Sequence, residues 1–298
     1  MKKRPPAYKS SLILSITATL LVLLTTLFIM RPSLAKKLQH KLYRAQSQDR
    51  HQLREVPAGD RLDLGNRLYL LDQMKAGDSP FTSAPTLLLV SASHPLPSLF
   101  EAEIIEDPLT ELKMSPYLAP NFTDLSQAVS QEFGEKLYVS SFYRTDQEQE
   151  EIWAASPDLA LPSGCSEHQT GLALDVYVFQ FAGANFINAP AGFWVNENAW
   201  RYGFIVRYPL GREDLTGVPF EPWHLRYVGK PHAEIMEVHG WVLEEYLQNL
   251  QEDRLYQFGD YFLLRSSRTE FYLPDSGHPI YFSPDNLGSY VMWGLLTP

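Results

Sequence analysis

One uncharged, apolar segment, residues 11–30, limits more than any other feature what this chain can fold into. The segment is twenty residues long and rich in Leu, Ile, Val and Thr. At about 1.5 Å per residue, a helix of this length matches the roughly 30 Å hydrocarbon core of a bilayer. A long helix with no polar face is poorly suited to a globular domain. We therefore predict that residues 11–30 form an uncleaved transmembrane anchor.

Basic residues on both sides of this segment indicate its orientation. They are Lys2, Lys3, Arg4 and Lys9 before it, and Arg31, Lys36 and Lys37 after it. By the positive-inside rule, the preceding bases keep residues 1–10 as a cytoplasmic tail, and the following bases weaken this preference without reversing it. We expect a single-pass protein of the cell membrane whose body is extracytoplasmic. The alternative is a signal peptide cleaved near Ala35, where residues 33–35 have the small-x-small pattern of a cleavage site, and a secreted body.

The rest of the chain is strongly acidic, which excludes some classes of partner. Residues 1–46 hold nine bases and no acid, and residues 47–298 hold 16 bases against 35 acids, a net charge of −19. Such a body has no basic surface for phosphates, so we expect no nucleic-acid partner. The chain is 45% apolar and can therefore bury a sizeable core. Its single cysteine, Cys165, excludes an intrachain disulfide and a Cys-rich metal cluster.

The segments that flank the central part of the chain differ from each other in character. Residues 31–84 mix charged and Gln-rich stretches with scattered Pro and Gly, and we interpret them as a stalk or linker. Residues 251–298 contain short aromatic runs separated by turn sequences at 274–277 and 283–286, a pattern typical of short strands. We therefore expect a small β appendage at residues 251–298.

The central part, residues 85–250, combines helical and strand periodicity. Apolar residues at helical spacing predict a helix at 121–133, and strict alternation predicts a strand at 172–178 that directs Asp175 away from its apolar face. The other predicted elements are strands at 87–90 and 137–139 and helices at 146–154 and 231–250. On periodicity alone, this region is a mixed α and β domain.

Four residues of the central domain have the chemistry of a catalytic metal site: His168, Asp175, Glu221 and His224. Two imidazoles and one carboxylate suit zinc and leave a fourth position open to water. Gly171 lies between His168 and Asp175, so a turn into a strand can bring both side chains to one centre. Glu221, three residues before His224, is close enough to act as general base to the attacking water without binding the metal.

A structural explanation of these residues competes with the metal site. A histidine beside apolar residues is more often a hydrogen-bonded part of the core than a metal ligand. Asp175 is harder to explain in this way, because a carboxylate inside an apolar strand must be paired or bound to a metal. Spacing alone leaves both interpretations open and slightly favours the zinc site.

The sequence around these residues resembles a known family. Four stretches carry the resemblance: Ser-Glu-His-Gln-Thr-Gly-Leu-Ala-Leu-Asp at 166–175, Trp-Arg-Tyr-Gly-Phe-Ile-Val-Arg-Tyr-Pro at 200–209, Leu-Thr-Gly at 215–217 and Glu-Pro-Trp-His-Leu-Arg-Tyr-Val-Gly at 221–229. They are similar to the VanY-type D-alanyl-D-alanine carboxypeptidases, part of the LAS group of peptidoglycan metallopeptidases, and the similarity extends over about residues 85–250. The resemblance implies zinc bound by His168, Asp175 and His224, with Glu221 as the catalytic base.

The resemblance also implies a substrate pocket. Arg144, Gln149 and Ser166 would hold the C-terminal D-residue of the substrate, and a guanidinium suits that carboxylate because it can bind it bidentately. Two positions depart from the family pattern: Phe142 replaces the usual Gly of Ser-Gly-Tyr-Arg, and Cys165 replaces the usual Tyr or Thr before Ser-Glu-His. Neither is a predicted ligand, so both bear on fine specificity rather than on the class of reaction.

The fold implied by the resemblance is α+β: a small, mostly antiparallel sheet flanked by helices, with zinc in a cleft on the open face. The implied reaction is hydrolysis of the terminal D-Ala–D-Ala bond of peptidoglycan stem pentapeptides or their lipid-linked precursors. That reaction would serve cell-wall remodelling and resistance to glycopeptide antibiotics such as vancomycin. Two alternatives are an L,D-carboxypeptidase that trims tetrapeptide stems with the same zinc set, and a non-catalytic wall-binding module. The presence of Glu221 beside an intact ligand set argues against the second.

Overall fold

The computed structural model describes residues 52–57, 60 and 66–296. The predicted cytoplasmic tail, the predicted anchor at 11–30 and the first part of the predicted stalk lie outside these residues. Within the described part of the chain, no helix is both long enough and apolar enough to cross a membrane. The described residues fall within one unit of the chain, Arg50–Pro298.

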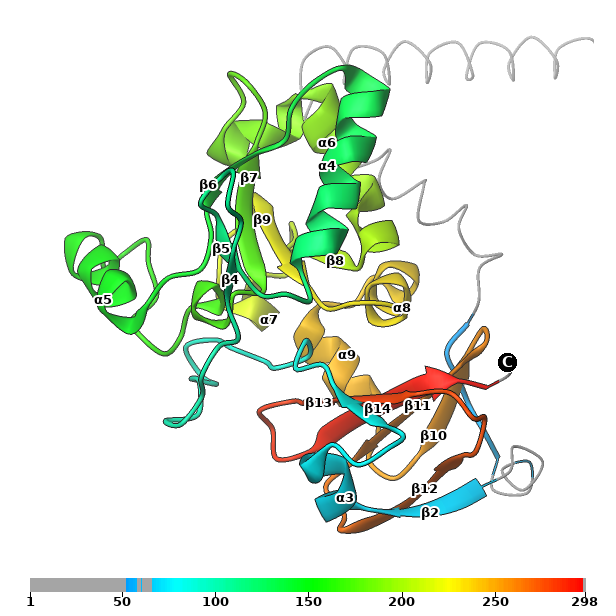
Figure 1. Cartoon of the computed structure of the whole chain (residues 1–298). Helices are drawn as coiled ribbons and strands as arrows, with labels where there is room; N and C mark the ends of the chain where they lie inside the picture. The colour runs from blue at the N-terminus through cyan, green and yellow to red at the C-terminus, as the bar shows by residue number, and fades with distance from the viewer. Residues whose placement is uncertain (1–51, 58–59, 61–65, 297–298) are drawn as a thin grey trace, which may run out of the picture. The chain divides into compact units, whose positions relative to one another are not determined.

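A four-stranded antiparallel sheet carries two of the three predicted metal ligands, Asp175 and His224 (Figure 1). Its strands are β6 (Tyr138–Ser141), β7 (Ala173–Tyr177), β9 (Glu221–Tyr227) and β8 (Phe204–Tyr208), in that spatial order. In the pair of β7 and β9, Leu174 lies opposite Leu225 and Asp175 lies opposite His224. Side chains alternate between the two faces of a strand. One face of this pair is therefore apolar, and the other holds the polar side chains.

Two helices, α4 (Ala119–Phe133) and α6 (Pro190–Asn198), cover the apolar face of this sheet. Leu125 and Val129 of α4, Val195 of α6 and Leu174 of β7 are fully buried in one cluster. The apolar residues of α4 recur at helical spacing, which forms the stripe that a sheet can cover. α4 ends at Gly134, whose φ of 67° is left-handed and suits glycine. The predicted helix at 121–133 and the mixed α and β architecture are confirmed.

The remaining predictions for the central part agree with the structure except at 87–90 and 231–250. β6 and α5 (Asp146–Ala155) lie at the predicted strand and helix, and α5 begins with a capping box between Thr145 and Glu148. The predicted long helix is wrong: α8 (His232–His239) and α9 (Leu243–Asn249) are separated at Gly240, which has a φ of 69°. The shorter elements are β4 (Ile105–Glu106), β5 (Lys113–Met114), α7 (Glu213–Thr216) and the 3₁₀ segments η3 (Glu167–Thr170), η4 (Gly183–Asn188) and η5 (Ala199–Tyr202).

A second sheet is built from both ends of the described chain. Its six strands are, in spatial order, β1 (Arg54–Glu55), β10 (Leu255–Phe258), β11 (Tyr261–Ser266), β14 (Tyr290–Leu295), β13 (Ile280–Pro284) and β3 (Phe81–Ser83). A separate pair joins β2 (Asn66–Leu70), which α3 (Leu71–Ala76) follows, to β12 (Glu270–Pro274). The predicted stalk is therefore wrong for residues 54–55, 66–70 and 81–83, because these strands complete the sheets of the C-terminal β region, residues 251–296. The aromatic residues that predicted the appendage form this region's strands.

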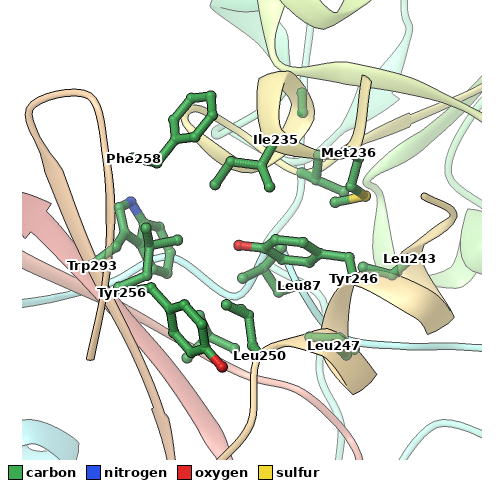
Figure 2. Packing of buried hydrophobic residues seen from close by; sticks show 14 of the residues in the cluster. Leu87, Ile235, Met236, Leu243, Tyr246, Leu247, Leu250, Tyr256, Phe258 and Trp293 are labelled. Carbon is green, nitrogen blue, oxygen red and sulfur yellow. The ribbon is translucent and has the colours of Figure 1, made fainter. Parts of the chain in front are cut away.

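The C-terminal β region shares a core with α8 and α9, the helices that follow the four-stranded sheet (Figure 2). Tyr246 of α9 and neighbouring residues of α8 and α9 pack in one buried cluster with Tyr256, Phe258 and Trp293 of the second sheet. Because Leu250 and Tyr256 both belong to this cluster, the predicted domain boundary after residue 250 falls inside a core. Residues 87–90 do not form the predicted strand; they are buried in irregular structure.

Candidate active site

The three predicted metal ligands meet at one centre. His168 comes from η3, Asp175 from β7 and His224 from the adjacent strand β9, and one donor atom of each lies within 4.8 Å of the others. The Oδ2 of Asp175 is 3.4 Å from the Nε2 of His168, and its Oδ1 is 3.0 Å from the Nδ1 of His224. Both imidazoles are buried. The structure thus brings together two imidazole nitrogens and a carboxylate, the set that the sequence analysis singled out.

Each of the two imidazoles is held from behind by a hydrogen-bond partner. The Nδ1 of His168 is 2.9 Å from the backbone carbonyl oxygen of Phe142, and the Nε2 of His224 is 3.4 Å from the Oε2 of Glu167. The other nitrogen of each ring faces Asp175. Metal-binding histidines usually donate their second N–H to a carbonyl or carboxylate in this way, which fixes the tautomer and the ring orientation. The arrangement therefore fits a metal ion between the two rings and Asp175.

Gly171 makes the approach of His168 to Asp175 possible. It ends η3 with a left-handed φ of 70°, and β7 begins two residues later. A Cβ at this position would overlap the side chain of Ile104 and lie only 3.0 Å from the backbone nitrogen of Ser115. Any residue other than glycine would strain or displace this turn.

Glu221, the predicted general base, stands at the edge of the same centre. It is the first residue of β9, and its Oε2 lies 3.9 Å from the Nδ1 of His224. Its side chain remains 24% exposed, so solvent can reach it. Burial raises the pKa of Glu221, and the opposing attraction of His224 does not cancel this effect. A carboxylate with a raised pKa beside a metal site has the properties of a general base.

Arg144 and Gln149, two predicted substrate-binding residues, form a cluster beside Asp175. Arg144 donates through Nη1 to the Oε1 of Gln149 at 3.0 Å, and through Nη2 to Ser141 at 2.6 Å. The same Nη2 lies 3.7 Å from the Oδ2 of Asp175. Ser166 is buried at the start of η3, and among the described residues its hydroxyl forms no hydrogen bond with Arg144 or Gln149. The structure therefore joins two of the three predicted residues directly and adds Ser141, which the sequence analysis did not select.

The two departures from the family pattern leave the centre intact. Phe142 supplies only its backbone carbonyl to His168, and its side chain packs at the edge of the buried cluster under the sheet. Cys165 is buried, and burial raises the pKa of its thiol. In the part of the chain that the structure describes, Cys165 is not a member of the metal-binding group. A packing role accounts for it.

The sequence analysis missed a buried charge network behind His224. The Oε1 of Glu167 accepts from the Nε of Arg207 at 2.7 Å and from the Nη1 of Arg226 at 2.8 Å. Although burial opposes it, the two guanidinium groups hold the pKa of Glu167 well below its ordinary value. Arg207 also donates twice to Glu244 of α9, at 2.6 and 2.9 Å. The available signal was an arginine inside each of the two apolar strands, β8 and β9.

Two histidines and an aspartate can hold one metal ion, and here Glu221 and Arg144 lie beside these three residues. This arrangement is that of a class of metal-dependent peptidases. A family model described as D-alanyl-D-alanine carboxypeptidase, VanY, matches residues 111–230. A bifunctional D-Ala-D-Ala dipeptidase and D-Ala-D-Ala carboxypeptidase from Enterococcus gallinarum, VanXYC, is 34% identical over 54% of this chain and 93% of its own length. This chain belongs to the VanY family of D-alanyl-D-alanine carboxypeptidases, as its sequence motifs indicated.

Two other relatives define the extent of the similarity. A D-alanyl-D-alanine carboxypeptidase of Enterococcus faecium is 40% identical over 149 residues, which make up 49% of this chain and 47% of that protein. The similarity therefore spans about half the length of that enzyme. The structure of the D,D-dipeptidase VanXYg in complex with a D-Ala-D-Ala phosphinate analogue is 26% identical, covers 76% of this chain and 97% of its own, and has a TM-score of 0.64. Zinc, the predicted cofactor, is the metal of this family, and the donors described above fit it.

Proposed function

We propose that this chain is a zinc-dependent D,D-carboxypeptidase that removes the terminal D-Ala from peptidoglycan stem pentapeptides. The observation that carries the proposal is the convergence of His168, Asp175 and His224, with Glu221 beside His224 and Arg144 beside Asp175. The names of the relatives support it, because the E. faecium protein is a D-alanyl-D-alanine carboxypeptidase and the VanXYg structure holds a D-Ala-D-Ala analogue.

His168, Asp175 and His224 would hold the zinc ion. When bound, zinc supplies a Lewis acid that polarises the scissile carbonyl and makes water a stronger acid. Glu221 accepts a proton from the attacking water and returns it to the nitrogen of the leaving D-Ala as the C–N bond breaks. The products are free D-Ala and a tetrapeptide stem, and Glu221 is again a carboxylate.

Arg144 would bind the free carboxylate of the substrate, with Gln149 and Ser166 around the terminal D-residue. A guanidinium offers two parallel N–H donors to a carboxylate, which fixes its direction as well as its position. Gln149 orients Arg144 because its own amide is fixed: its Nε2 donates to the backbone oxygen of Leu161 at 2.6 Å. Since Arg144 lies beside Asp175, a carboxylate on this arginine would place the preceding peptide bond near the metal centre.

We also propose that the enzyme works outside the cytoplasm, attached to the membrane through residues 11–30. The support is the apolar composition of that segment and the basic residues that precede it. In this position the enzyme would meet stem pentapeptides and their lipid-linked precursors. Removal of the terminal D-Ala would remodel the wall and destroy the D-Ala-D-Ala target of vancomycin.

The test is an assay of the full chain, purified in detergent and supplied with zinc and a muramyl pentapeptide ending in D-Ala-D-Ala. We expect mass spectrometry to show the loss of one alanine unit, and no loss with a chelator or in Glu221→Ala. Trimming of a tetrapeptide without cleavage of the pentapeptide would move the assignment to an L,D-carboxypeptidase. If both peptides stay intact while zinc is bound, the wall-binding module becomes the better explanation.

A further inference from the structure

Residues 84–89 run between the C-terminal β region and the four-stranded sheet of β6, β7, β9 and β8, here called the catalytic sheet. Their backbone is buried and forms hydrogen bonds outside the regular pairing of strands. Four of these partners lie in or directly after β13. Ala84 N donates to Phe282 O at 2.8 Å, Leu87 N to Ser283 Oγ at 2.9 Å and Leu89 N to Asp285 O at 3.2 Å, and Asn286 Nδ2 donates to Leu89 O at 2.9 Å. Buried backbone groups require such partners. One side of the segment is therefore fixed by the second sheet.

The other side of the same segment is held by one side chain of the catalytic sheet. The Nη2 of Arg226 donates to the carbonyl oxygens of Thr86 and Leu88, at 3.1 and 2.9 Å. Arg226 lies in β9, two residues after His224, and is fully buried. Its position is thus determined by a segment whose opposite edge is bonded to β13.

Arg226 passes this constraint to the metal site through Glu167. One carboxylate oxygen of Glu167, Oε1, is occupied by Arg226 and Arg207, and the other, Oε2, faces the Nε2 of His224. Glu167 and both arginines have fully buried side chains. No solvent can replace a missing partner here, so Arg226 fixes the position of Glu167, and Glu167 fixes the ring of His224.

We propose that Glu167 is a positioning residue for His224, and that the C-terminal β region fixes Glu167 through residues 84–89 and Arg226. The inference rests on His224 being a zinc ligand, as in the proposed function. A carboxylate behind Nε2 holds the proton on that nitrogen and leaves the lone pair of Nδ1 directed at the metal centre. The C-terminal β region would thereby act on zinc affinity from a distance.

The first experiment changes Glu167 and measures zinc binding rather than turnover alone. In the full-length protein, Glu167→Gln should weaken zinc binding about 10- to 100-fold, the usual effect of losing a partner of a ligating histidine. Glu167→Asp keeps the negative charge beside the two arginines, so this variant should fold. Its shorter side chain no longer reaches His224, so its zinc affinity should be lower than that of the wild type. The visible absorption of the cobalt-substituted protein should also change, because it reports the geometry of the ligands.

The second experiment uses two buried serines of the same sheet as a matched pair. Ser283→Ala removes the acceptor for Leu87 N, whereas Ser266→Ala removes a buried hydroxyl of β11 that donates to Asp253 at 2.7 Å and does not touch residues 84–89. We expect Ser283→Ala to weaken zinc binding about 2- to 30-fold, the range of coupling reported along packed networks. Ser266→Ala should lower the melting temperature and leave the zinc dissociation constant unchanged.

The outcomes separate this inference from the proposed function. If the wild-type protein binds zinc and cleaves the pentapeptide, but Glu167→Asp and Ser283→Ala bind zinc as tightly as the wild type, the positioning role is wrong and the enzyme assignment stands. If the two serine variants weaken zinc binding equally, the effect is general destabilisation and the proposal is again wrong. A wild-type protein that binds no zinc overturns both.

Discussion

Two buried histidines, His224 and His232, show how different surroundings give one side chain opposite properties. His224 lies between the carboxylates of Asp175 and Glu167; burial alone would lower its pKa, but these hydrogen bonds raise the pKa of His224 to about 9. His232 lies in the apolar core beside Tyr246 and Trp293, and burial lowers its pKa to about 3. The polar region around His224 therefore stabilises a charged side chain, whereas the apolar region around His232 excludes one. Changes in the first should alter catalysis, and changes in the second should alter stability.

The largest effect is expected for Glu221→Ala. Because Glu221 moves the proton but does not bind the metal, its loss should lower kcat about 10²- to 10⁴-fold and leave zinc affinity and melting temperature near wild type. Single-turnover hydrolysis of the pentapeptide and a zinc titration measure the two quantities. A variant that kept wild-type turnover would remove Glu221 from the mechanism.

Acid should destabilise the His232 region. The unfolded chain protonates this residue near pH 6.5 and the folded protein only near pH 3. Between these values the unfolded state binds more protons, so the free energy of unfolding falls as the pH falls, by up to about 5 kcal/mol from this residue. Urea unfolding from pH 7 to pH 4 measures the slope, and His232→Leu should flatten it. If His232→Leu leaves the pH dependence of the free energy of unfolding unchanged, the folded protein protonates His232 at nearly the same pH as the unfolded chain.

Arg144→Lys tests the polar region without removing its charge. Lysine cannot reproduce the two parallel donors, so kcat/KM should fall about 10- to 150-fold, mainly through KM. Zinc affinity should not change, because lysine keeps the positive charge beside Asp175. Arg201→Lys, an exposed arginine of η5, is the matched control and should behave as wild type.

The smallest effect is expected for Tyr246→Phe in the apolar region. The hydroxyl of Tyr246 is 2.6 Å from the Nδ1 of His232, and its removal leaves a buried nitrogen unpaired. The free energy of unfolding should fall by about 1 to 3 kcal/mol, with no change in kcat or zinc affinity. Tyr272→Phe, at a tyrosine that is 61% exposed, should change the stability by less than about 0.5 kcal/mol. A loss of zinc affinity in Tyr246→Phe would show that the two regions are not independent.

The residues at the centre of the site could be predicted because they lie in short sequence motifs. His168 and Asp175 are separated by one turn, and Glu221 and His224 by three residues, so local spacing brought together the members of each pair. The family resemblance then joined the two pairs in one site. Glu167 and Arg226 escaped prediction because their pairing depends on which strands become neighbours. Nothing in the sequence states that residues 167 and 226 meet.

The errors in the fold have the same origin. The predicted stalk contained β1 and β3, strands of two and three residues whose partners, β10 and β13, lie about 200 residues further along the chain. Such short strands carry no periodicity that could reveal them. The break in the predicted helix at 231–250 was different, because Gly240 was a visible signal for a helix end and the apolar pattern on both sides outweighed it.

The pairing of β1 and β3 with strands about 200 residues later also has a consequence for the order of folding. Leu87 and its partner Ser283 are 196 residues apart, so this contact forms only after nearly the whole chain has been synthesised. Contacts of such high sequence separation form slowly. The elements that carry the metal ligands, η3, β7 and β9, are complete by residue 227, well before β13 exists. A nascent chain therefore contains all three metal ligands before the strands that support them exist. It gains its final metal affinity only when β13 pairs with β3.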